Sequence, residues 1–245
     1  MIAIFRANAQ CHCTSVRKIA ITVVGRHRPV GRGLLVGVKL PWLAAPGDEG
    51  VVAAARRLLG WRVTANGVTV RLTEVEAYSG EGADPASHAH RGRTPRSAVM
   101  FGPAGHAYVY FTYGMHWCLN VVCGPVGQAA AVLLRAGEVV EGVETARARR
   151  AGVRSDRDLA RGPARLTSAL GLDGLANATS MLDGTGPLRL RPPASMIDPT
   201  TVASGPRVGV NGGAERPWRF WLAGDPTVSP YRAHTPRRRG SEIQG

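Results

Sequence analysis

The spacing of hydrophobic residues predicts a helix followed by a β-hairpin in the first clearly patterned part of the chain. Over residues 50–60 the apolar positions recur three and four residues apart, and Gly60 fits a left-handed C-cap. Residues 61–64 and 68–73 alternate between apolar and polar side chains and flank an Asn-Gly pair. An Asn-Gly pair between two alternating segments is typical of a tight β-hairpin.

Helical and strand-like spacing both continue through the rest of the chain. Helices are expected over residues 142–150 and 163–170, and strands over residues 188–190, 207–210 and 218–222. Because the two kinds of element are mixed and no repeat is visible, the sequence predicts an α+β fold. We expect a single domain with a curved, mainly antiparallel sheet, surrounding helices and a protruding β-hairpin.

Basic charge is concentrated at the two ends of the chain. Residues 1–46 contain seven Lys and Arg side chains, no acidic side chain and no sustained periodicity, which predicts a disordered N-terminal extension. A transit peptide and a misassigned start codon are alternatives for this segment. Residues 229–245 predict a basic C-terminal tail, which leaves residues 47–228 as the domain. The net charge of +14 favours a polyanionic partner, although a GC-rich coding sequence would also raise the arginine content.

The composition excludes several classes of protein. The apolar stretches are far shorter than the roughly 20 residues of a membrane-spanning helix, so we expect a soluble, cytoplasmic protein. Four cysteines in 245 residues do not make a disulfide framework, and we expect them to be reduced. Neither Cys11-His12-Cys13 nor His88-Ala89-His90 has further ligands at suitable spacing, so we expect no metal site.

Two carboxylates lie at the end of an apolar strand. Val70 and Leu72 share a strand face, and Glu74 and Glu76 continue the same alternation. A carboxylate on a core-facing row costs free energy unless it is paired or used in chemistry, so either residue is a candidate general base. The alternatives are a strand that simply leaves the core and a β-bulge that turns Val75 inward.

Tyrosines gather on a second expected hairpin. Tyr108 and Tyr110 share one face of a strand-like segment, and a turn at Gly114 would place Tyr113 at the hairpin tip. A large exposed aromatic side chain at such a tip can replace a lost stacking partner in a nucleic-acid duplex. The alternative is that these tyrosines belong to the core, because tyrosine is common in strands.

A polar loop over residues 79–96 joins the carboxylates to the tyrosines. Its basic and imidazole side chains are His88, His90, Arg91, Arg93 and Arg96. Side chains of this kind suit contacts with phosphate groups, so we expect the loop to contact a nucleic-acid backbone.

Short motifs follow one another in a fixed order from the carboxylates onward. They are Thr73-Glu74-Val75-Glu76-Ala77-Tyr78, Ser87-His88-Ala89, Arg93-Thr94-Pro95-Arg96, Met100-Phe101, residues 108–115, Cys118-Leu119-Asn120-Val121, Leu133-Leu134-Arg135-Ala136, residues 162–166 and residues 217–220. In order and spacing this series resembles the alkyladenine (3-methyladenine) DNA glycosylase family, over residues 50–228. The loop 79–85 and His90 depart from the family's pattern, which bears on substrate preference and not on the chemistry.

The resemblance implies roles for individual residues. Glu76 is implied as the general base, Arg135 as the group that helps to hold the attacking water, and Tyr113 as the side chain that intercalates into DNA. The pocket for the extruded base is implied to consist of Tyr78, His88, Tyr110 and Asn120. Asn120 would obstruct the 2-amino group of normal guanine at the pocket floor. Contacts to the DNA backbone are expected from Arg91, Arg93, Arg96, Met115 and His116.

The resemblance also implies a reaction. The expected substrate is double-stranded DNA that contains alkylated or deaminated purines, of the 3-methyladenine, 7-methylguanine, hypoxanthine and ethenoadenine class. An activated water would hydrolyse the N-glycosidic bond and leave an abasic site, without a cofactor, in a monomeric enzyme associated with a bacterial nucleoid. The only lysines are Lys18 and Lys39, both in the expected N-terminal extension, so we expect no lyase step through a Schiff base.

Two other functions stay open from the residues alone. A basic nucleic-acid-binding protein without catalysis could use the tyrosines to stack on bases. A hydrolase for carbohydrates or nucleosides could use Glu74 and Glu76 as a pair of catalytic carboxylates.

Overall fold

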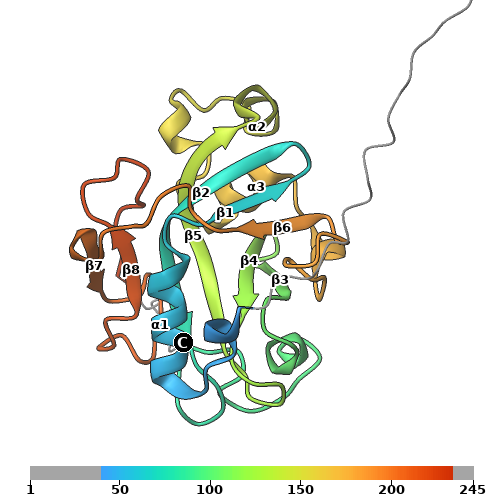
Figure 1. Cartoon of the computed structure of the whole chain (residues 1–245), viewed down its shortest axis with the longest axis vertical. Helices are drawn as coiled ribbons and strands as arrows, with labels where there is room; N and C mark the ends of the chain where they lie inside the picture. The colour runs from blue at the N-terminus through green and yellow to red at the C-terminus, as the bar shows by residue number, and fades with distance from the viewer. Residues whose placement is uncertain (1–39, 234–245) are drawn as a thin grey trace, which may run out of the picture. The chain divides into compact units, whose positions relative to one another are not determined.

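The computed structural model describes residues 40–233, which contain three α-helices and one eight-stranded sheet (Figure 1). The helices are α1 (Gly47–Leu58), α2 (Val143–Arg149) and α3 (Pro163–Leu170). The strands are β1 (Arg62–Ala65), β2 (Val68–Tyr78), β3 (Ala107–Thr112), β4 (His116–Val122), β5 (Ala131–Glu141), β6 (Leu188–Arg191), β7 (Val202–Gly205) and β8 (Arg219–Leu222). Short 3-10 turns lie at Pro41–Ala44, Ala98–Phe101, Asp156–Asp158, Gly174–Ala176 and Pro199–Thr201.

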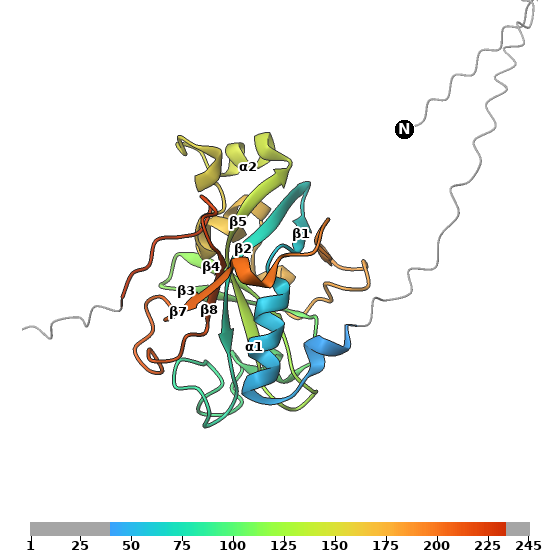
Figure 2. The ribbon, with the colours of Figure 1, turned by 60° about the vertical axis from the view of Figure 1, so that its left-hand side comes forward.

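Strand β2 is the centre of the sheet. The strand order is β3-β4-β5-β2-β1-β6, all neighbours are antiparallel, and β7 joins through β8, which pairs with β2. One edge of β2 pairs with β5, whereas its other edge pairs first with β1 at residues 68–71 and then with β8 at residues 74–76. Figures 1 and 2 show that the sheet is strongly curved, with α1 against its strands and α2 beyond the end of β5. The predicted α+β fold with a curved, antiparallel sheet is confirmed.

The helices follow the predicted spacing. Helix α1 begins three residues before the predicted start, and its buried positions are Gly50, Val51, Ala54, Ala55 and Leu58. Acidic side chains occupy its first turn and arginines its last turn, which matches the helix dipole. Helices α2 and α3 are confirmed, and Pro163 occupies the first turn of α3. The predicted first hairpin is also confirmed, because the Asn66-Gly67 pair turns with positive φ angles of 48° and 79°.

A bulge in β2 corrects the predicted placement of the carboxylates. The register with β5 shifts between Leu72 and Glu74 and again between Glu74 and Val75. As a result Val75 joins Leu72 in the main core, and Glu74 and Glu76 face the other side of the sheet. The prediction that both carboxylates continue the core-facing row is therefore wrong, and the bulge is the alternative that applies. Both carboxylates are nevertheless fully buried.

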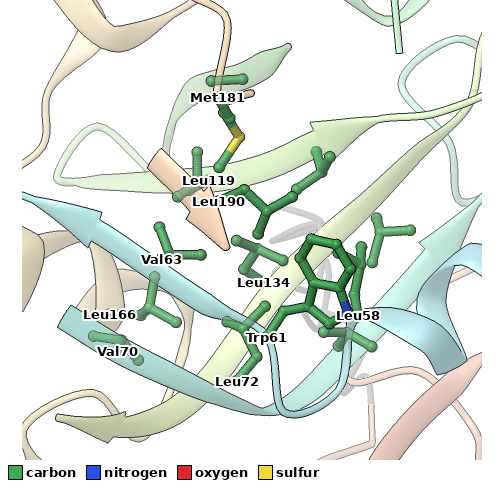
Figure 3. Packing of buried hydrophobic residues seen from close by; sticks show 14 of the residues in the cluster. Leu58, Trp61, Val63, Val70, Leu72, Leu119, Leu134, Leu166, Met181 and Leu190 are labelled. Atoms are coloured by element: carbon green, nitrogen blue, oxygen red, sulfur yellow. The ribbon is translucent and has the colours of Figure 1, made fainter. Parts of the chain in front are cut away.

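The main core lies between the sheet and helices α1 and α3 (Figure 3). It includes Leu58 of α1, Leu166 of α3, Leu72 of β2 and Leu134 of β5, all with no exposed surface. A second, smaller apolar cluster lies beneath the loop that precedes β3, and contains Met100 and Phe101. Strands β3 to β5 therefore have apolar side chains packed on both faces.

One predicted strand is absent, and two observed strands were not predicted. Residues 207–210 form no strand, because Arg207 is buried and Gly209 turns the chain with φ of 68°. The strand in this region is β7, at Val202–Gly205, and it was not predicted. Strand β5 was not predicted either, since its run of apolar residues is buried on both faces and shows no alternation.

The ends of the folded part differ from the expected boundaries. The 3-10 turn at Pro41–Ala44 lies within the expected extension, and Leu43 is buried in the main core. At the other end Ser229 is buried against β2. Residues 1–39 and 234–245 lie outside the described part, and with them most of the expected extension and tail.

Candidate active site

A cleft of about 540 Å³ opens on the polar face of β2. This volume falls within the range of about 300–1,000 Å³ that is usual for small-molecule sites. Its walls come from β2, β3, β4 and β5, from the loops at residues 85–88 and 208–212, and from the start of α3. The residues from the sequence analysis that line it are Glu76, Tyr78, His88, Tyr110, Tyr113, His116, Asn120 and Arg135. Segments far apart in the sequence therefore bring most of the expected site residues into one cleft.

Glu76 is the buried carboxylate of this cleft. Its Oε2 accepts a hydrogen bond from the Tyr78 hydroxyl at 2.8 Å, and its Oε1 accepts one from the backbone N–H of Val208 at 2.8 Å. The Arg135 guanidinium lies 3.3 Å from Oε1. A carboxylate has about four acceptor positions, so these two hydrogen bonds and the ion pair fix Glu76 without filling its acceptor capacity.

Arg135 connects Glu76 to the second carboxylate. Its Nε donates to Glu74 at 2.8 Å, and Arg219 donates to the same Glu74 oxygen at 2.6 Å. Ser229 adds a backbone N–H at 2.7 Å and a hydroxyl at 3.0 Å. Burial acts to raise the pKa of Glu74, but Arg135, Arg219 and Ser229 outweigh it and hold this pKa below its usual value. Glu74 does not line the cleft, so the geometry does not support a catalytic carboxylate pair.

Aromatic side chains form one wall of the cleft. The rings of Tyr108 and Tyr110 lie 5.3 Å apart, and the His88 ring meets Tyr110 edge-on at 4.6 Å. The Tyr108 hydroxyl lies 2.9 Å from His88 Nδ1. Burial raises the pKa of Tyr108 to about 12 and that of Tyr110 further, and it also raises the pKa of Tyr78 well above its usual value. These tyrosines are therefore neutral at physiological pH and present uncharged ring faces.

His88 is also neutral near pH 7. Burial lowers its pKa to about 4, and the nearby Arg96 guanidinium adds to this effect. A neutral imidazole offers one donor and one acceptor nitrogen, and it does not repel a positively charged ligand.

Asn120 and Cys118, both on β4, also line the cleft. The Asn120 amide donates to the backbone carbonyl of Tyr108 at 3.0 Å, which fixes the side chain across the β3–β4 pair. Burial raises the pKa of the Cys118 thiol, so this residue is a neutral, weakly polar part of the wall.

Tyr113 is the most exposed large side chain of the β3–β4 hairpin. Residues 113–115 form the turn, Tyr113 adopts a positive φ of 51°, and its side chain is 85% exposed. Met115 beside it is 65% exposed. The predicted hairpin is thus confirmed, and a large aromatic side chain does stand at its tip, at the mouth of the cleft.

The expected backbone-contacting arginines do not line the cleft. Arg91, Arg93 and Arg96 are all exposed. The Arg96 guanidinium lies 5.0 Å above the Tyr110 ring and donates to the carbonyl of Phe111 at 3.2 Å. Arg93 lies 5.5 Å from the Phe101 ring. Aromatic contacts thus place positive charge between the loop and the hairpin.

Several site groups were not identified from the sequence. The backbone N–H of Val208 has no sequence signal at all, because every residue other than proline carries one. The pairing of Glu74 with Arg219 could not be predicted either, because it links positions 145 residues apart.

Among residues 40–233, no three His, Cys, Asp or Glu side chains are placed to hold a metal ion. Within the same residues, no helix is long and apolar enough to cross a bilayer.

Comparison with known proteins identifies the family. The profile of the family "Methylpurine-DNA glycosylase (MPG)" matches residues 47–226. A protein of Streptomyces avermitilis is 58% identical over 187 residues, which cover 73% of this chain and 84% of the relative. A protein of Nocardia farcinica is 54% identical over 192 residues, which cover 77% of this chain and 90% of the relative.

Both relatives carry the name 3-methyladenine DNA glycosylase as a provisional assignment. A protein of Mycobacterium tuberculosis with the same provisional name is 47% identical over 197 residues, which cover 78% of this chain and 95% of the relative. The family profile spans the strands, helices and loops that build the cleft. This chain therefore belongs to the methylpurine-DNA glycosylase family of DNA repair enzymes.

Proposed function

We propose that this protein extrudes damaged purines from duplex DNA and hydrolyses their N-glycosidic bonds with a water activated by Glu76. The observation that carries the proposal is the environment of Glu76. This carboxylate is fully buried, lines a cleft with an aromatic wall, and is held by Tyr78, Arg135 and Val208. A buried carboxylate that lines a cleft, is held by donors and keeps acceptor capacity suits a general base.

The exposed Tyr113 at the hairpin tip suits the first step of the proposed reaction, which is extrusion of the base from the duplex. Extrusion of a base costs a few kcal/mol of lost pairing and stacking, and the cost is lowest for damaged or mispaired bases. In this proposal the Tyr113 ring enters the duplex and stacks in place of the extruded base. The exposed arginines of the loop, Arg91, Arg93 and Arg96, together with Met115 and His116 of the hairpin, contact the DNA backbone in this proposal.

The aromatic wall of the cleft suits the second step, which is binding of the extruded base. Tyr78, Tyr110 and neutral His88 offer uncharged faces to the base, and an aromatic face attracts the positive charge of an alkylated purine. Asn120, which also lines the cleft, limits which exocyclic groups fit. We therefore propose substrates among 3-methyladenine, 7-methylguanine, hypoxanthine and ethenoadenine.

The third step is hydrolysis. Glu76 takes a proton from the water as it attacks C1′ of the sugar, the C1′–N bond breaks, and its electron pair leaves with the base. Arg135 helps to hold that water beside Glu76. No lysine lies among residues 40–233, so the described part contains no lysine amine for a Schiff base, and we propose a monofunctional enzyme that leaves an abasic site. We further propose that it acts as a monomer on chromosomal DNA in a bacterial cytoplasm, without a cofactor.

A direct test uses duplex oligonucleotides that each contain one of the four lesions. Incubation with the full chain, followed by hot alkali, should cut the strand at the lesion for at least one of them. Glu76→Gln should abolish this cutting and retain DNA binding, whereas Glu138→Gln, an exposed carboxylate of β5, should behave like the unmodified protein. Binding without base release by the unmodified protein would instead establish the non-catalytic alternative.

The absence of a lyase step has its own test. Borohydride added during the reaction should trap no covalent protein–DNA adduct. A trapped adduct that disappears in Lys18→Ala or Lys39→Ala would contradict the monofunctional assignment.

A further inference from the structure

A buried ion pair lies behind the cleft and joins its two loop walls. Arg207 and Asp84 both have fully buried side chains and form two parallel hydrogen bonds, at 2.6 and 2.7 Å. Asp84 belongs to the loop that carries Pro85 and His88 into the cleft, and Arg207 directly precedes Val208 of the second loop that lines it. Neither charged side chain lines the cleft, so neither contacts a bound base.

The same guanidinium reaches two further parts of the site. It donates to the carbonyl of Ala77, between Glu76 and Tyr78, at 2.9 Å, and to the carbonyl of Gly213 at 3.3 Å. Its carbon lies 4.7 Å from the centre of the Tyr78 ring. Arg207 thus contacts β2 at the catalytic position and both loops around it.

The two loops also approach each other too closely for ordinary side chains. A Cβ on Gly212 would lie 2.7 Å from Pro85, and a Cβ on Gly213 would lie 2.8 Å from the Arg207 guanidinium. Gly213 also has a φ of 65°, which disfavours other residues. This close packing leaves the loop 207–213 one well-defined position against Asp84.

We propose that Arg207 is a positioning residue, which through Asp84 and Ala77 holds the Val208 N–H against Glu76 and the Tyr78 ring against the base. The proposal rests on the proposed function. A buried ion pair is an expensive way to hold two loops together, because both charges lose hydration, and a pair of this kind contributes little net stability. The ion pair is explained if the reaction needs the Val208 N–H and the Tyr78 ring in fixed positions. A displacement of about 1 Å can slow catalysis by about 100-fold.

The test compares Arg207→Met with Arg71→Met. Arg71 also pairs with an aspartate of a distant loop, Asp225, at 2.7 Å, but it lies away from the cleft. We expect Arg207→Met to lower the single-turnover rate of base release by about 10- to 100-fold. Its affinity for a duplex with an abasic-site analogue should stay within about threefold, because phosphate contacts dominate binding. Arg71→Met should change neither quantity.

A second measurement does not depend on activity. Hydrogen exchange of the Val208 amide, followed by NMR, should become faster in Arg207→Met, while the Ser229 amide, which is bonded to Glu74, should keep its protection. If Arg207→Met does not fold, Arg207→Lys serves, because it keeps the charge but lacks the planar guanidinium that forms two parallel hydrogen bonds to Asp84. A Val208 amide as protected as in the unmodified protein, or a rate equal to that of Arg71→Met, would overturn the proposal. Failure of the unmodified protein to release any base would refute the proposed function alone.

Discussion

Removal of the negative charge of Glu74 should destabilise the protein strongly. Four hydrogen bonds converge on this carboxylate, from Arg135, Arg219 and Ser229, and the side chain has no exposed surface. Glu74→Gln keeps the shape, but among residues 40–233 it leaves the buried Arg219 guanidinium with no carboxylate partner and the Arg135 guanidinium with Glu76 alone. Breaking a buried ion pair by removing one partner costs about 3–5 kcal/mol. Since a domain is stable by about 5–15 kcal/mol, the variant should fold with a much lower free energy of unfolding.

A second substitution separates charge balance from lost hydrogen bonds. The unmodified cluster has two carboxylates and two guanidiniums, so its charges balance. Glu74→Gln combined with Arg219→Met leaves one carboxylate and one guanidinium, so the charges balance again. The free energy of unfolding of the double variant should exceed the value expected from adding the two single effects by about 1–3 kcal/mol, the usual size of coupling between contacting residues. Urea unfolding of all four proteins, followed by tryptophan fluorescence at pH 7, gives the cycle directly.

The pH dependence gives an independent check. Because the folded protein holds the pKa of Glu74 below its ordinary value of 4.5, the unfolded chain binds a proton more readily. The stability that Glu74 contributes is therefore complete well above pH 4.5 and is lost as the pH falls through the folded pKa. The difference in stability between the unmodified protein and Glu74→Gln should shrink on acidification below about pH 4.5. A Glu74→Gln variant as stable as the unmodified protein, or strictly additive effects in the cycle, would refute this reasoning.

Three further changes give separable results. Tyr113→Ala should change the free energy of unfolding by no more than about 0.5 kcal/mol, because the side chain is 85% exposed. The single-turnover rate of base release should fall by roughly 5- to 150-fold, which corresponds to the loss of one stacking contact of about 1–3 kcal/mol. An unchanged rate would remove Tyr113 from the mechanism. His88 has a folded pKa of about 4 against an ordinary 6.5, so the unfolded state binds more protons between these values and stability falls as the pH is lowered through this window. Urea unfolding at pH 7 and pH 5 should show a smaller loss in His88→Gln, and an equal loss would contradict the shifted pKa. Gly137→Ala would push a Cβ against the backbone carbonyl of Arg71 on the neighbouring strand β2. Thermal unfolding should therefore show a destabilisation of about 1–3 kcal/mol. An unchanged Tm would show that β5 and β2 can move apart at this point without loss of stability.

The elements that were predicted correctly are those whose signals are local. Helix α1 has apolar residues at helical spacing, and the β1–β2 hairpin has an Asn-Gly turn between alternating segments. Strand β5 lacks such a signal, because it lies between two strands with both faces covered and its apolar run fits a helix as well as a strand. Residues 207–210 alternate like a strand, but the partner that draws Arg207 inward is Asp84, 123 positions away.

The candidate site shows the same contrast between features with a local sequence signal and features set by distant contacts. Glu76 was singled out from its place on a strand, although the alternation argument put it on the wrong face, and the motif series supplied the remaining side chains. The Val208 N–H and the Arg207–Asp84 pair could not be predicted, because both depend on a loop whose position is set by contacts distant in sequence. Side-chain identity at motif positions was therefore predictable, whereas the backbone donors and the supporting ion pairs were not.

The bulge in β2 explains how one strand can serve both the core and the chemistry. In a regular strand Leu72, Glu74 and Glu76 would share a face, and two carboxylates would enter the apolar core at a large desolvation cost. The extra residue reverses the alternation, so Val75 continues the core row of Leu72 and the carboxylates meet Arg135 on the other face. The change of pairing partner from β1 to β8 occurs at the same place, and β8 brings Arg219 to Glu74. The irregularity that misled the alternation argument is thus what allows a charged site to rest on a closely packed core.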